Sequence, residues 1–215
     1  MTPAEQLLSG ARAVIVDWDG TVVDNTAVRC AALTAALAPH DIPVPANRYS
    51  QLAGLPVRDV IAQLAADAGQ PVPTQLEDVL AHSRAALLGG PTPDLIACTL
   101  ELLHTARRLA VPRAVASSAA AVLVHHGIRK LHLAELLPIT VTLDDVPRGK
   151  PAPDAYLEAA RRLDTDPAQC LAVDDADEGI TAALAAGMRT LTIRHGRLIP
   201  VTATAAEGGH SAAQP

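Results

Sequence analysis

The sequence predicts an α/β protein whose core is a doubly wound, Rossmann-like parallel sheet, with a helical cap domain inserted into it. Two observations carry this prediction. From residue 93 onward, short apolar runs alternate with segments of helical spacing, which is the pattern of a parallel sheet covered by helices. From residue 25 to residue 90 the spacing is helical and no strand pattern occurs. The chain has 215 residues, which is enough for one core and one small inserted domain.

The predicted core strands are short apolar runs that lead into helical segments. The first run, Ala-Val-Ile-Val at residues 13–16, is apolar at every position, as expected of a strand buried on both faces. The other core elements are expected, in chain order, as a helix at 94–109, a strand at 113–116, a helix from about 119, a strand at 139–141, a helix at 153–163, a strand at 170–173, a helix at 178–186 and a strand at 190–193.

The inserted block is predicted to be helical because its apolar residues recur at helical spacing between turns that contain Pro and Gly. Its helices are expected at 25–38, 57–68 and 74–88. We therefore expect the domains to comprise a core of residues 1–24 and 93–200, a cap of residues 25–92, and a flexible tail over residues 201–215.

Composition and charge exclude several classes of function. The 17 basic and 23 acidic residues give a formal net charge of −6, and the absence of Phe leaves few rings on which bases could stack, so we expect no nucleic-acid partner. No apolar run reaches the roughly 18 residues of a membrane span. The three cysteines are widely separated, which argues against a disulfide framework. We expect a cytoplasmic protein that is a monomer or a weak dimer and has no membrane partner.

Polar residues follow the predicted core strands, and in an open parallel sheet ligands bind beyond the carboxyl ends of the strands. Asp17 and Asp19 follow the first strand, and Gly20 permits a sharp turn there. One carboxylate could serve as a nucleophile or a metal ligand while the other moves protons. A turn without any chemistry is the alternative, because Asp and Gly are common turn residues.

Two further motifs could bind an anion. Ser117 and Ser118 follow the strand at 113–116, where a hydroxyl and the amides of a helix start could hold a phosphate, although they could equally cap the helix. Lys150 stands in a loop that prolines stiffen, Gly-Lys-Pro-Ala-Pro-Asp. A fixed cation there could offset carboxylates and a phosphate, whereas a lone lysine before a helix is otherwise usually solvated.

Asp174 and Asp175 come directly after the strand at 170–173. Carboxylate oxygens gathered at a strand end are ligands that suit Mg²⁺. Two adjacent acids also repel each other unless a cation relieves them. The sequence therefore predicts a site for Mg²⁺ as cofactor at this edge of the sheet.

Taken together, these motifs resemble those of the haloacid dehalogenase superfamily of hydrolases, in the capped subgroup that includes β-phosphoglucomutase and phosphoglycolate phosphatase. The matching motifs occur in the family's order: DWDGTVVD at 17–24, VAS at 115–117, PRGKPAPD at 147–154, VDD at 173–175 and AAGM at 185–188. Any one of them alone is a weak signal, whereas the ordered set is specific. The resemblance covers the predicted core, and the cap is matched more weakly.

The resemblance implies a phosphoryl-transfer site. Asp17 is similar to the nucleophile that becomes phosphorylated, and Asp19 to the general acid and base. Ser117 matches the hydroxyl that holds the phosphate, and Lys150 matches the cation that stabilises both nucleophile and phosphate. The residues implied to hold Mg²⁺ are Asp17, Asp19 through its backbone carbonyl, Asp175 as a direct ligand, and Asp174 as its support or as a ligand through water.

For the substrate, Gly54-Leu55-Pro56 resembles the family's specificity turn, and the other candidate substrate-binding residues are Arg58, Arg84 and Ser118. The implied activity is a Mg²⁺-dependent phosphatase that hydrolyses a small phosphorylated metabolite, of sugar phosphate or phosphoglycolate type, through an aspartyl-phosphate. The alternatives are a phosphomutase similar to β-phosphoglucomutase and a partner-binding protein that has kept the fold. Against the mutase, Arg29 and Val57 stand where the resemblance places a His and an Arg in mutases.

Trp18 and the pair His125 and His126 are expected to have structural roles only. Trp18 stands where Phe or Leu is common in the family, and it is expected to pack beneath the site. His125 and His126 are adjacent, a spacing that suits chelation on neither a helix face nor a strand face. They are expected at the end of a helix that Gly127 closes.

Overall fold

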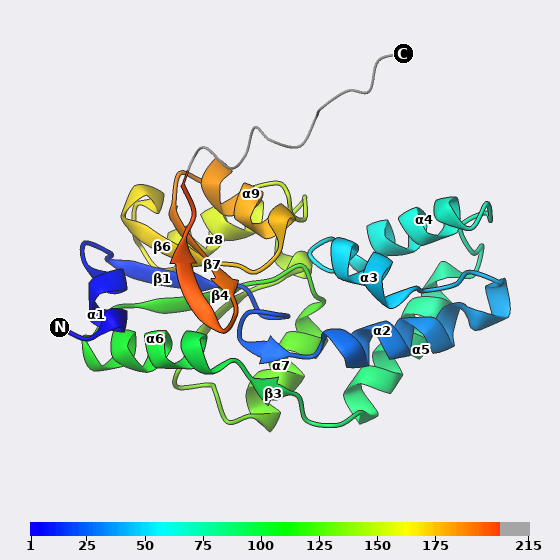
Figure 1. Cartoon of the computed structure of the whole chain (residues 1–215), viewed down its shortest axis with the longest axis horizontal. Coiled ribbons are helices and arrows are strands. Elements are labelled where there is room, and N and C mark those ends of the chain that lie inside the picture. The colour runs from blue at the N-terminus through cyan, green and yellow to red at the C-terminus, as the bar shows by residue number, and fades with distance from the viewer. Residues whose placement is uncertain (203–215) are drawn as a thin grey trace, which may run out of the picture.

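The core of the computed structural model, which describes residues 1–202, is a six-stranded sheet in the order β5-β4-β1-β6-β7-β8 (Figure 1). Neighbours from β5 to β7 pair parallel, and β8 pairs antiparallel with β7 at one edge. The strands are β1 (Ala13–Val16), β4 (Arg113–Ala116), β5 (Ile139–Val141), β6 (Cys170–Val173), β7 (Arg189–Arg194) and β8 (Arg197–Pro200). Because β1 lies between β4 and β6, the carboxyl ends of these three strands meet at one place, where the strand order reverses.

Helices cover both faces of this sheet (Figure 1). On one face lie α1 (Pro3–Leu8), α6 (Ala97–Arg108) and α7 (Ala121–Lys130), and on the other lie α8 (Asp154–Arg162) and α9 (Asp177–Ala185). Alternate residues of β1 serve the two faces, because Val14 and Val16 pack on the first side and Ala13 and Ile15 on the second. The strand is therefore apolar at every position, and the predicted doubly wound α/β fold is confirmed.

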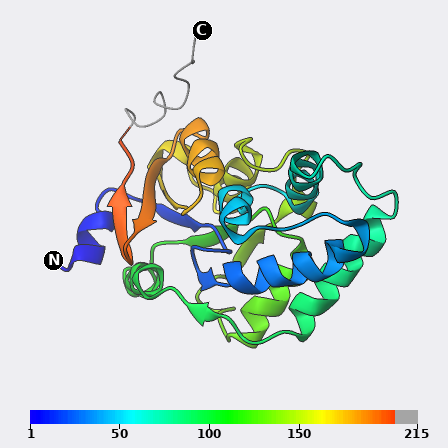
Figure 2. The same ribbon diagram turned by 45° about the vertical axis from the view of Figure 1, so that its right-hand side comes forward.

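Between β1 and β4 the chain leaves the sheet and forms four helices with a hydrophobic cluster of their own. They are α2 (Thr26–Leu37), α3 (Ala46–Leu52), α4 (Val57–Asp67) and α5 (Leu76–Gly89). Figure 2 shows this group standing beside the sheet, with α2 and α5 side by side. Leu33, Tyr49, Ile61 and Leu64 are buried within it. The group therefore has its own core, separate from the two clusters that flank the sheet.

The chain enters and leaves this helical group through a short two-stranded ladder. The strands β2 (Val23–Asp24) and β3 (Asp94–Leu95) pair antiparallel, with Val23 opposite Leu95. The helix expected from residue 94 therefore begins three residues later, at Ala97. The ladder therefore holds the two connections between the sheet and the helical group side by side.

The structure differs from the sequence expectations in three details. Residues 197–200, for which no strand was expected, form β8, because their backbone pairs with β7. The helix that carries His125 and His126 runs on to Lys130, so Gly127 lies inside α7 and does not end it. A Cβ at Gly127 would lie 2.5 Å from Cζ2 of Trp18, so glycine is required by the close packing of that ring. The helix α3 was not predicted at all.

Of the segment expected to be a tail, the structure describes Val201 and Thr202, and residues 203–215 lie outside the described residues. The Val201 amide donates a hydrogen bond to the Thr190 carbonyl (2.9 Å), so this residue continues the sheet edge. Within residues 1–202, no helix combines the length and the apolar character that a membrane crossing requires.

Candidate active site

The site begins where β1 ends, at Asp17 and the turn that follows it. The Asp17 amide donates to the Val173 carbonyl of β6 (2.9 Å), which fixes this backbone beside the neighbouring strand. Gly20 has φ +84°, and a Cβ there would lie 2.3 Å from Oδ2 of Asp175. Both the positive φ and the close approach demand glycine. The turn therefore brings the first acidic motif against the last one.

A buried lysine joins two of the acidic residues. Nζ of Lys150 donates to Oδ1 of Asp17 (2.6 Å) and to Oδ2 of Asp174 (2.7 Å), and its side chain is 2% exposed. Tyr156 lies at the same place, where its hydroxyl donates to Oδ2 of Asp174 (2.6 Å) and its ring centroid is 5.2 Å from Nζ of Lys150. The Ala176 amide donates to Oδ1 of Asp174 (3.1 Å). Asp174 thus uses both of its oxygens inside the protein.

The electrostatics of this cluster depend on burial and on the close approach of like charges. Burial raises the pKa of the Asp17 carboxyl well above its ordinary value, with Lys150 opposing the change and Asp174 adding to it. Burial also acts to lower the pKa of Lys150, but the attraction of Asp17 and Asp174 outweighs it and the pKa rises. Burial and then the charge of Asp174 raise the pKa of Asp175 to about 6. Lys150 is therefore a fixed cation. Its charge does not fully offset the effects of burial and of neighbouring acids on the pKa values of Asp17 and Asp175.

Asp175 differs from its neighbour in its contacts. Thr21 donates its hydroxyl to Oδ1 of Asp175 (2.8 Å). Ligand oxygens of Asp17, Asp174 and Asp175 lie within 4.8 Å of one another. Because Lys150 and Tyr156 already occupy Asp174, Asp175 and Asp17 are the better placed pair to meet a cation at this point.

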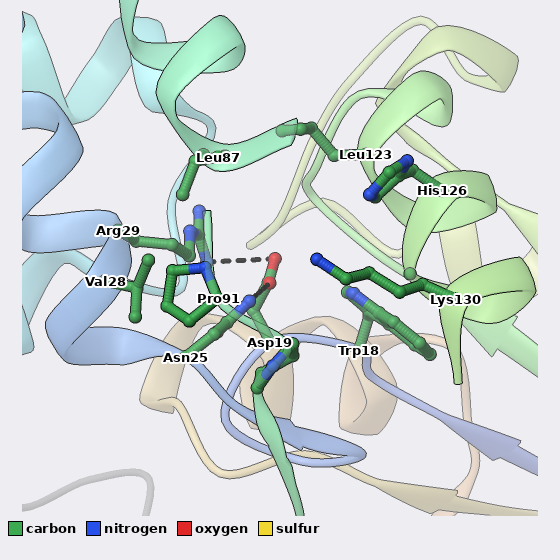
Figure 3. A pocket seen from close by; sticks show the side chains of 12 residues that line it. Trp18, Asp19, Asn25, Val28, Arg29, Leu87, Pro91, Leu123, His126 and Lys130 are labelled. Carbon is green, nitrogen blue, oxygen red and sulfur yellow. Dashed lines mark hydrogen bonds and ion pairs between the residues drawn. The ribbon is translucent and has the colours of Figure 1, made fainter. Parts of the chain in front are cut away.

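The second acid of the first motif is held by the helical group instead. Arg29 on α2 forms an ion pair with Asp19, with NH1 2.9 Å from Oδ2, and the side chains are 14% and 12% exposed (Figure 3). Asn25 donates its amide to Oδ1 of Asp19 (2.6 Å). The Asp19 carboxylate is therefore not part of the acid cluster, and a helix outside the sheet fixes its direction.

The two serines after β4 lie at the edge of the same space. Ser117 is buried, and its hydroxyl accepts a hydrogen bond from the Ala119 amide (3.1 Å). Ser118 donates its hydroxyl to the Gly54 carbonyl (3.1 Å), which links the core to the turn after α3. The turn at Gly54 and the first turn of the β4–α7 connection are therefore in direct contact.

These residues enclose a cavity of about 80 Å³. Most of the candidate residues predicted from the sequence line it, namely Asp17, Asp19, Gly54, Ser117, Ser118, Lys150, Asp174 and Asp175. Two candidates do not: Arg58 and Arg84 line a neighbouring cavity of about 160 Å³. Arg58 also forms an exposed ion pair with Glu77.

The comparison with known families decides the identity. The family model of the haloacid dehalogenase-like hydrolases matches residues 11–187, which include both acidic motifs, Ser117 and Lys150. The chain belongs to the haloacid dehalogenase-like hydrolase family. The resemblance drawn from the sequence motifs is thereby confirmed.

Relatives of this hydrolase have names that describe phosphatases. The validoxylamine A 7'-phosphate phosphatase of Streptomyces hygroscopicus subsp. limoneus is 30% identical over 178 residues, which cover 82% of this chain and 83% of that protein. The fructose-1-phosphate phosphatase YqaB of Escherichia coli is 31% identical over 185 residues, which cover 84% of this chain and 95% of that protein. The expectation of an enzyme of the phosphoric monoester hydrolase class is confirmed.

Two further matches bear on the fold and on the alternative activity. CbbY from Rhodobacter sphaeroides, solved with xylulose 1,5-bisphosphate, superposes with a TM-score of 0.75 at 24% identity and 85% coverage of each chain, and this likeness shows the fold alone. A β-phosphoglucomutase of Bacillus subtilis is 28% identical over 193 residues, covering 86% of this chain and 84% of that protein. Names of both hydrolysis and transfer activities therefore occur among its relatives.

Sequence reasoning missed several residues of this hydrolase's site. Tyr156 lies six positions after Lys150 and is one of two tyrosines in the chain, but no motif marks it. Asn25 was placed only at a helix start, and the contact of Arg29 with Asp19 was not predicted. The ion pair joins segments that only the fold brings together, so no local spacing could have revealed it.

The acid cluster predicts a pH effect on the metal-free protein. Asp175 has a pKa of about 6 in the folded state and an ordinary value near 3.8, so the folded protein binds more protons between these pH values. This contribution to stability is present below about pH 4 and is lost as the pH rises through 6, by roughly 3 kcal/mol.

To measure this effect, urea unfolding of wild-type protein and Asp175→Asn should be compared from pH 4 to pH 8 in EDTA. We expect the variant to gain stability relative to wild type as the pH rises, and the gain to shrink when Mg²⁺ is added. A difference between the two proteins that does not depend on pH would contradict the prediction.

Proposed function

We propose that this protein is a Mg²⁺-dependent phosphatase that releases phosphate from a small phosphorylated metabolite through a phosphorylated Asp17. The observation that carries the proposal is the convergence of Asp17, Asp19, Ser117, Lys150 and Asp175 on one cavity of about 80 Å³. A nucleophile, an acid, a phosphate-binding hydroxyl and a fixed cation are the groups that phosphoryl transfer needs in one place. The family membership and the phosphatases among the relatives support the same activity.

In the proposed first step, a carboxylate oxygen of Asp17 attacks phosphorus and the bond to the alcohol oxygen breaks. Asp19 donates a proton to that departing oxygen. Lys150, which contacts Oδ1 of Asp17 at 2.6 Å, offsets the charge that gathers between nucleophile and phosphate. The hydroxyl of Ser117 would hold a phosphate oxygen.

In the proposed second step, Asp19 accepts a proton from a water molecule, whose oxygen attacks the phosphorus of the phosphorylated Asp17. The bond between phosphorus and the Asp17 oxygen breaks, phosphate leaves, and both carboxyl groups return to their starting state. Arg29 forms a nearly buried ion pair with Asp19 and fixes the direction of the carboxylate that takes up this proton. The arginine is therefore well placed to orient Asp19 toward the attacking water.

The donor set fits a hard divalent cation. Oxygens of Asp17, Asp174 and Asp175 lie within 4.8 Å of one another, and burial together with the neighbouring acids raises the pKa values of Asp17 and Asp175, so a cation would favour their ionised forms. We propose Asp17, Asp175 and the backbone carbonyl of Asp19 as ligands of Mg²⁺, with Asp174 as a supporting residue. Bound there, Mg²⁺ would supply the charge that offsets the carboxylates and the phosphate.

The two acids of the last motif should respond differently to substitution. Asp175→Asn is expected to weaken Mg²⁺ binding more than about 100-fold, whereas Asp174→Asn should weaken it by about 10 to 100-fold, the range for residues that orient a ligand. Titration of Mg²⁺ against activity, and calorimetry without substrate, would give both affinities. A larger defect at Asp174 would show that the direct ligand and its support are assigned the wrong way round.

We propose that residues 25–92 act as a cap and that the leaving group lies in the cavity of about 160 Å³ next to the catalytic one. The two cavities share Arg29, Tyr49 and Ser118 in their linings, so one substrate could reach both. Arg58 and Arg84 on the cap would then meet the polar end of the leaving group. A sugar phosphate uses this second space, and a molecule of phosphoglycolate size leaves much of it empty.

The activity is tested by phosphate release from a panel of phosphorylated metabolites, with Mg²⁺ and with EDTA. We expect Mg²⁺-dependent release, and a higher kcat/KM for hexose and hexitol phosphates than for phosphoglycolate. Absence of release from every member of the panel, with metal bound, would contradict the phosphatase. Faster turnover of phosphoglycolate would contradict the placement of the leaving group.

The mutase alternative is separated by following two products at once. The enzyme is incubated with β-glucose 1-phosphate, a trace of the bisphosphate and Mg²⁺, and both glucose 6-phosphate and free phosphate are measured. We expect phosphate release without isomerisation, because Arg29 replaces the histidine of mutases and contacts Asp19 directly. Conversion to glucose 6-phosphate with little phosphate release would establish the mutase instead.

A further inference from the structure

A cavity of about 60 Å³ lies where the inserted helices join the core, and it shares Asp19 and Arg29 with the catalytic cavity. Both connections of the helical group border it, through Asn25 on one and Pro91 and Pro93 on the other. Figure 3 shows side chains of α7 and of α2 facing each other across it. We call this space the hinge cavity. Its volume is about four times the ~15 Å³ that one water needs.

Cationic and donor groups enter the hinge cavity from both sides. Lys130 on α7 lies at its rim, where Nζ donates to the Gly90 carbonyl (2.9 Å) and no acidic side chain of residues 1–202 forms an ion pair with it. Arg29 enters from α2 with one of its nitrogens on Asp19. His126 lines the cavity, and its Nε2 is buried without a hydrogen-bond partner in the described structure. Two cations face one carboxylate here, so the cavity favours an anion.

Acceptors are present in the same cavity. Asn25 uses its amide nitrogen on Asp19, and its Oδ1 is buried without a partner in the described part of the chain. The Asp19 carboxylate also lines the wall. A ligand that satisfies such a mixture must accept from Lys130, donate to Asn25 or Asp19, and pair with Nε2 of His126, which donates or accepts according to its tautomer. An oxyanion that carries a proton does all three, whereas a fully ionised one such as sulfate has no hydrogen to donate.

We propose that the hinge cavity is a binding site for a small protonated oxyanion, with hydrogen phosphate as the species that fits, and that it is separate from the catalytic site. Lys130 and His126 line this cavity and not the catalytic one, whereas Asp17 lines only the catalytic one, so an anion held by Lys130 and His126 is not the phosphate that reacts at Asp17. Bound phosphate would bridge Lys130 and His126 of the core to Arg29 of the helical group. It would hold the two parts together and slow the opening of the site.

The proposed slowing of site opening by phosphate rests on the proposed function, because phosphate is the product of a phosphatase. The binding of phosphate to the hinge cavity does not rest on that function, so it can be measured without turnover. The chain offers a direct reporter, since Trp18 is its single tryptophan and lines the hinge cavity beside Lys130. The fluorescence of Trp18 in the full chain should therefore change when a ligand binds in the hinge cavity.

Inorganic phosphate is titrated against Trp18 fluorescence in metal-free wild-type protein at pH 7, and sulfate is titrated in parallel. We expect a saturable change with phosphate and at least about tenfold weaker binding of sulfate. Thermal unfolding in the same solutions gives a second measurement, because a ligand of the folded state raises Tm. Equal binding of the two anions, or no change with phosphate in either measurement, would overturn the proposal.

Three variants locate the anion, each checked by circular dichroism for a native fold. Lys130→Gln is expected to weaken phosphate at least about tenfold. Arg129→Gln removes the same charge from an exposed neighbour on the same helix outside the cavity, and it should bind like wild type. Ser117→Ala, which alters the catalytic cavity, should also keep the response. A response that survives in Lys130→Gln and disappears in Ser117→Ala would place the phosphate at Asp17 and reject the hinge site.

Discussion

Asp17→Asn is expected to abolish turnover while the protein stays folded. The substitution replaces a nucleophilic carboxylate oxygen by an amide and changes the side-chain volume very little. We expect kcat to fall at least about 1,000-fold, which corresponds to ~4 kcal/mol of barrier. The free energy of unfolding of the metal-free protein should not decrease above pH 6, because burial and the nearby acids already disfavour the ionised form of Asp17.

The measurement is phosphate release under saturating Mg²⁺, with urea unfolding in EDTA on the same preparations. Asp78→Asn, at an exposed position of α5 outside the acidic motifs, serves as the matched control and should retain wild-type activity. Acid-quenched wild-type enzyme should also carry one phosphoryl group on the peptide that contains Asp17. Turnover of Asp17→Asn within about tenfold of wild type would remove it as the nucleophile.

The core of the candidate site could be read from the sequence because its residues directly follow strands. The carboxyl ends of β1, β4 and β6 meet in the sheet, so the motifs after these strands were expected to converge, and Asp17, Ser117, Asp174 and Asp175 line one cavity. The continuous apolar run of β1 likewise indicated a strand covered on both faces. Polar motifs directly after parallel strands must lie at one edge of the sheet, and a strand that is apolar at every position must be covered on both faces.

The contacts made by the inserted helices could not be read in this way. Arg29 meets Asp19 because the β2–β3 ladder directs α2 back across the site, and the direction of a connection leaves no periodic signal in the sequence. Arg58 and Arg84 were chosen for their charge, and the fold places both beside a neighbouring cavity. Tyr156 was overlooked because a buried ring beside a cation cannot be told from an ordinary core residue by spacing.

The errors at Gly127 and at β8 have a common physical origin. Glycine after two histidines suggests a helix end, but tertiary packing against Trp18 requires a glycine in the middle of α7. The four residues of β8, Arg-Leu-Ile-Pro, are too few and too exposed to show a strand pattern, and the segment is held by its pairing with β7 and by the packing of Leu198 against the core. In both places a contact distant in sequence overrides the local preference.

The Lys150→Met variant is expected to lose both activity and stability, because Lys150 lies between two buried carboxylates. Its Nζ contacts Asp17 at 2.6 Å and Asp174 at 2.7 Å, and methionine of similar length would leave both without a cation. Removal of one partner from a buried ion pair costs about 3 to 5 kcal/mol of unfolding free energy. Loss of the charge that faces the transferring phosphate should lower kcat at least about 100-fold, or ~2.7 kcal/mol of barrier.

The sign of the pH effect makes this prediction specific. Without Lys150 the pKa of Asp17 rises further, since the lysine charge is what opposes the effect of burial on this carboxyl. The variant should therefore lose most stability near pH 7.5 and less near pH 5, where the buried acids take up protons. Urea unfolding of metal-free protein at the two pH values measures the difference, and Mg²⁺ should restore part of the loss at pH 7.5.

Two controls separate the buried network from a general loss of charge. Arg148→Met removes a cation from the same loop, but this side chain is 70% exposed in its ion pair with Asp154, so we expect little or no loss of unfolding free energy. Tyr156→Phe removes one hydrogen bond to Asp174 and leaves the lysine in place, so its loss should fall between the other two. Two results would show that Asp17 and Asp174 do not depend on the lysine charge. One is an unfolding free energy of Lys150→Met no lower than that of Arg148→Met at pH 7.5. The other is a larger loss of unfolding free energy in Lys150→Met at pH 5 than at pH 7.5. The proposed role of Lys150 beside the nucleophile would then have to be abandoned.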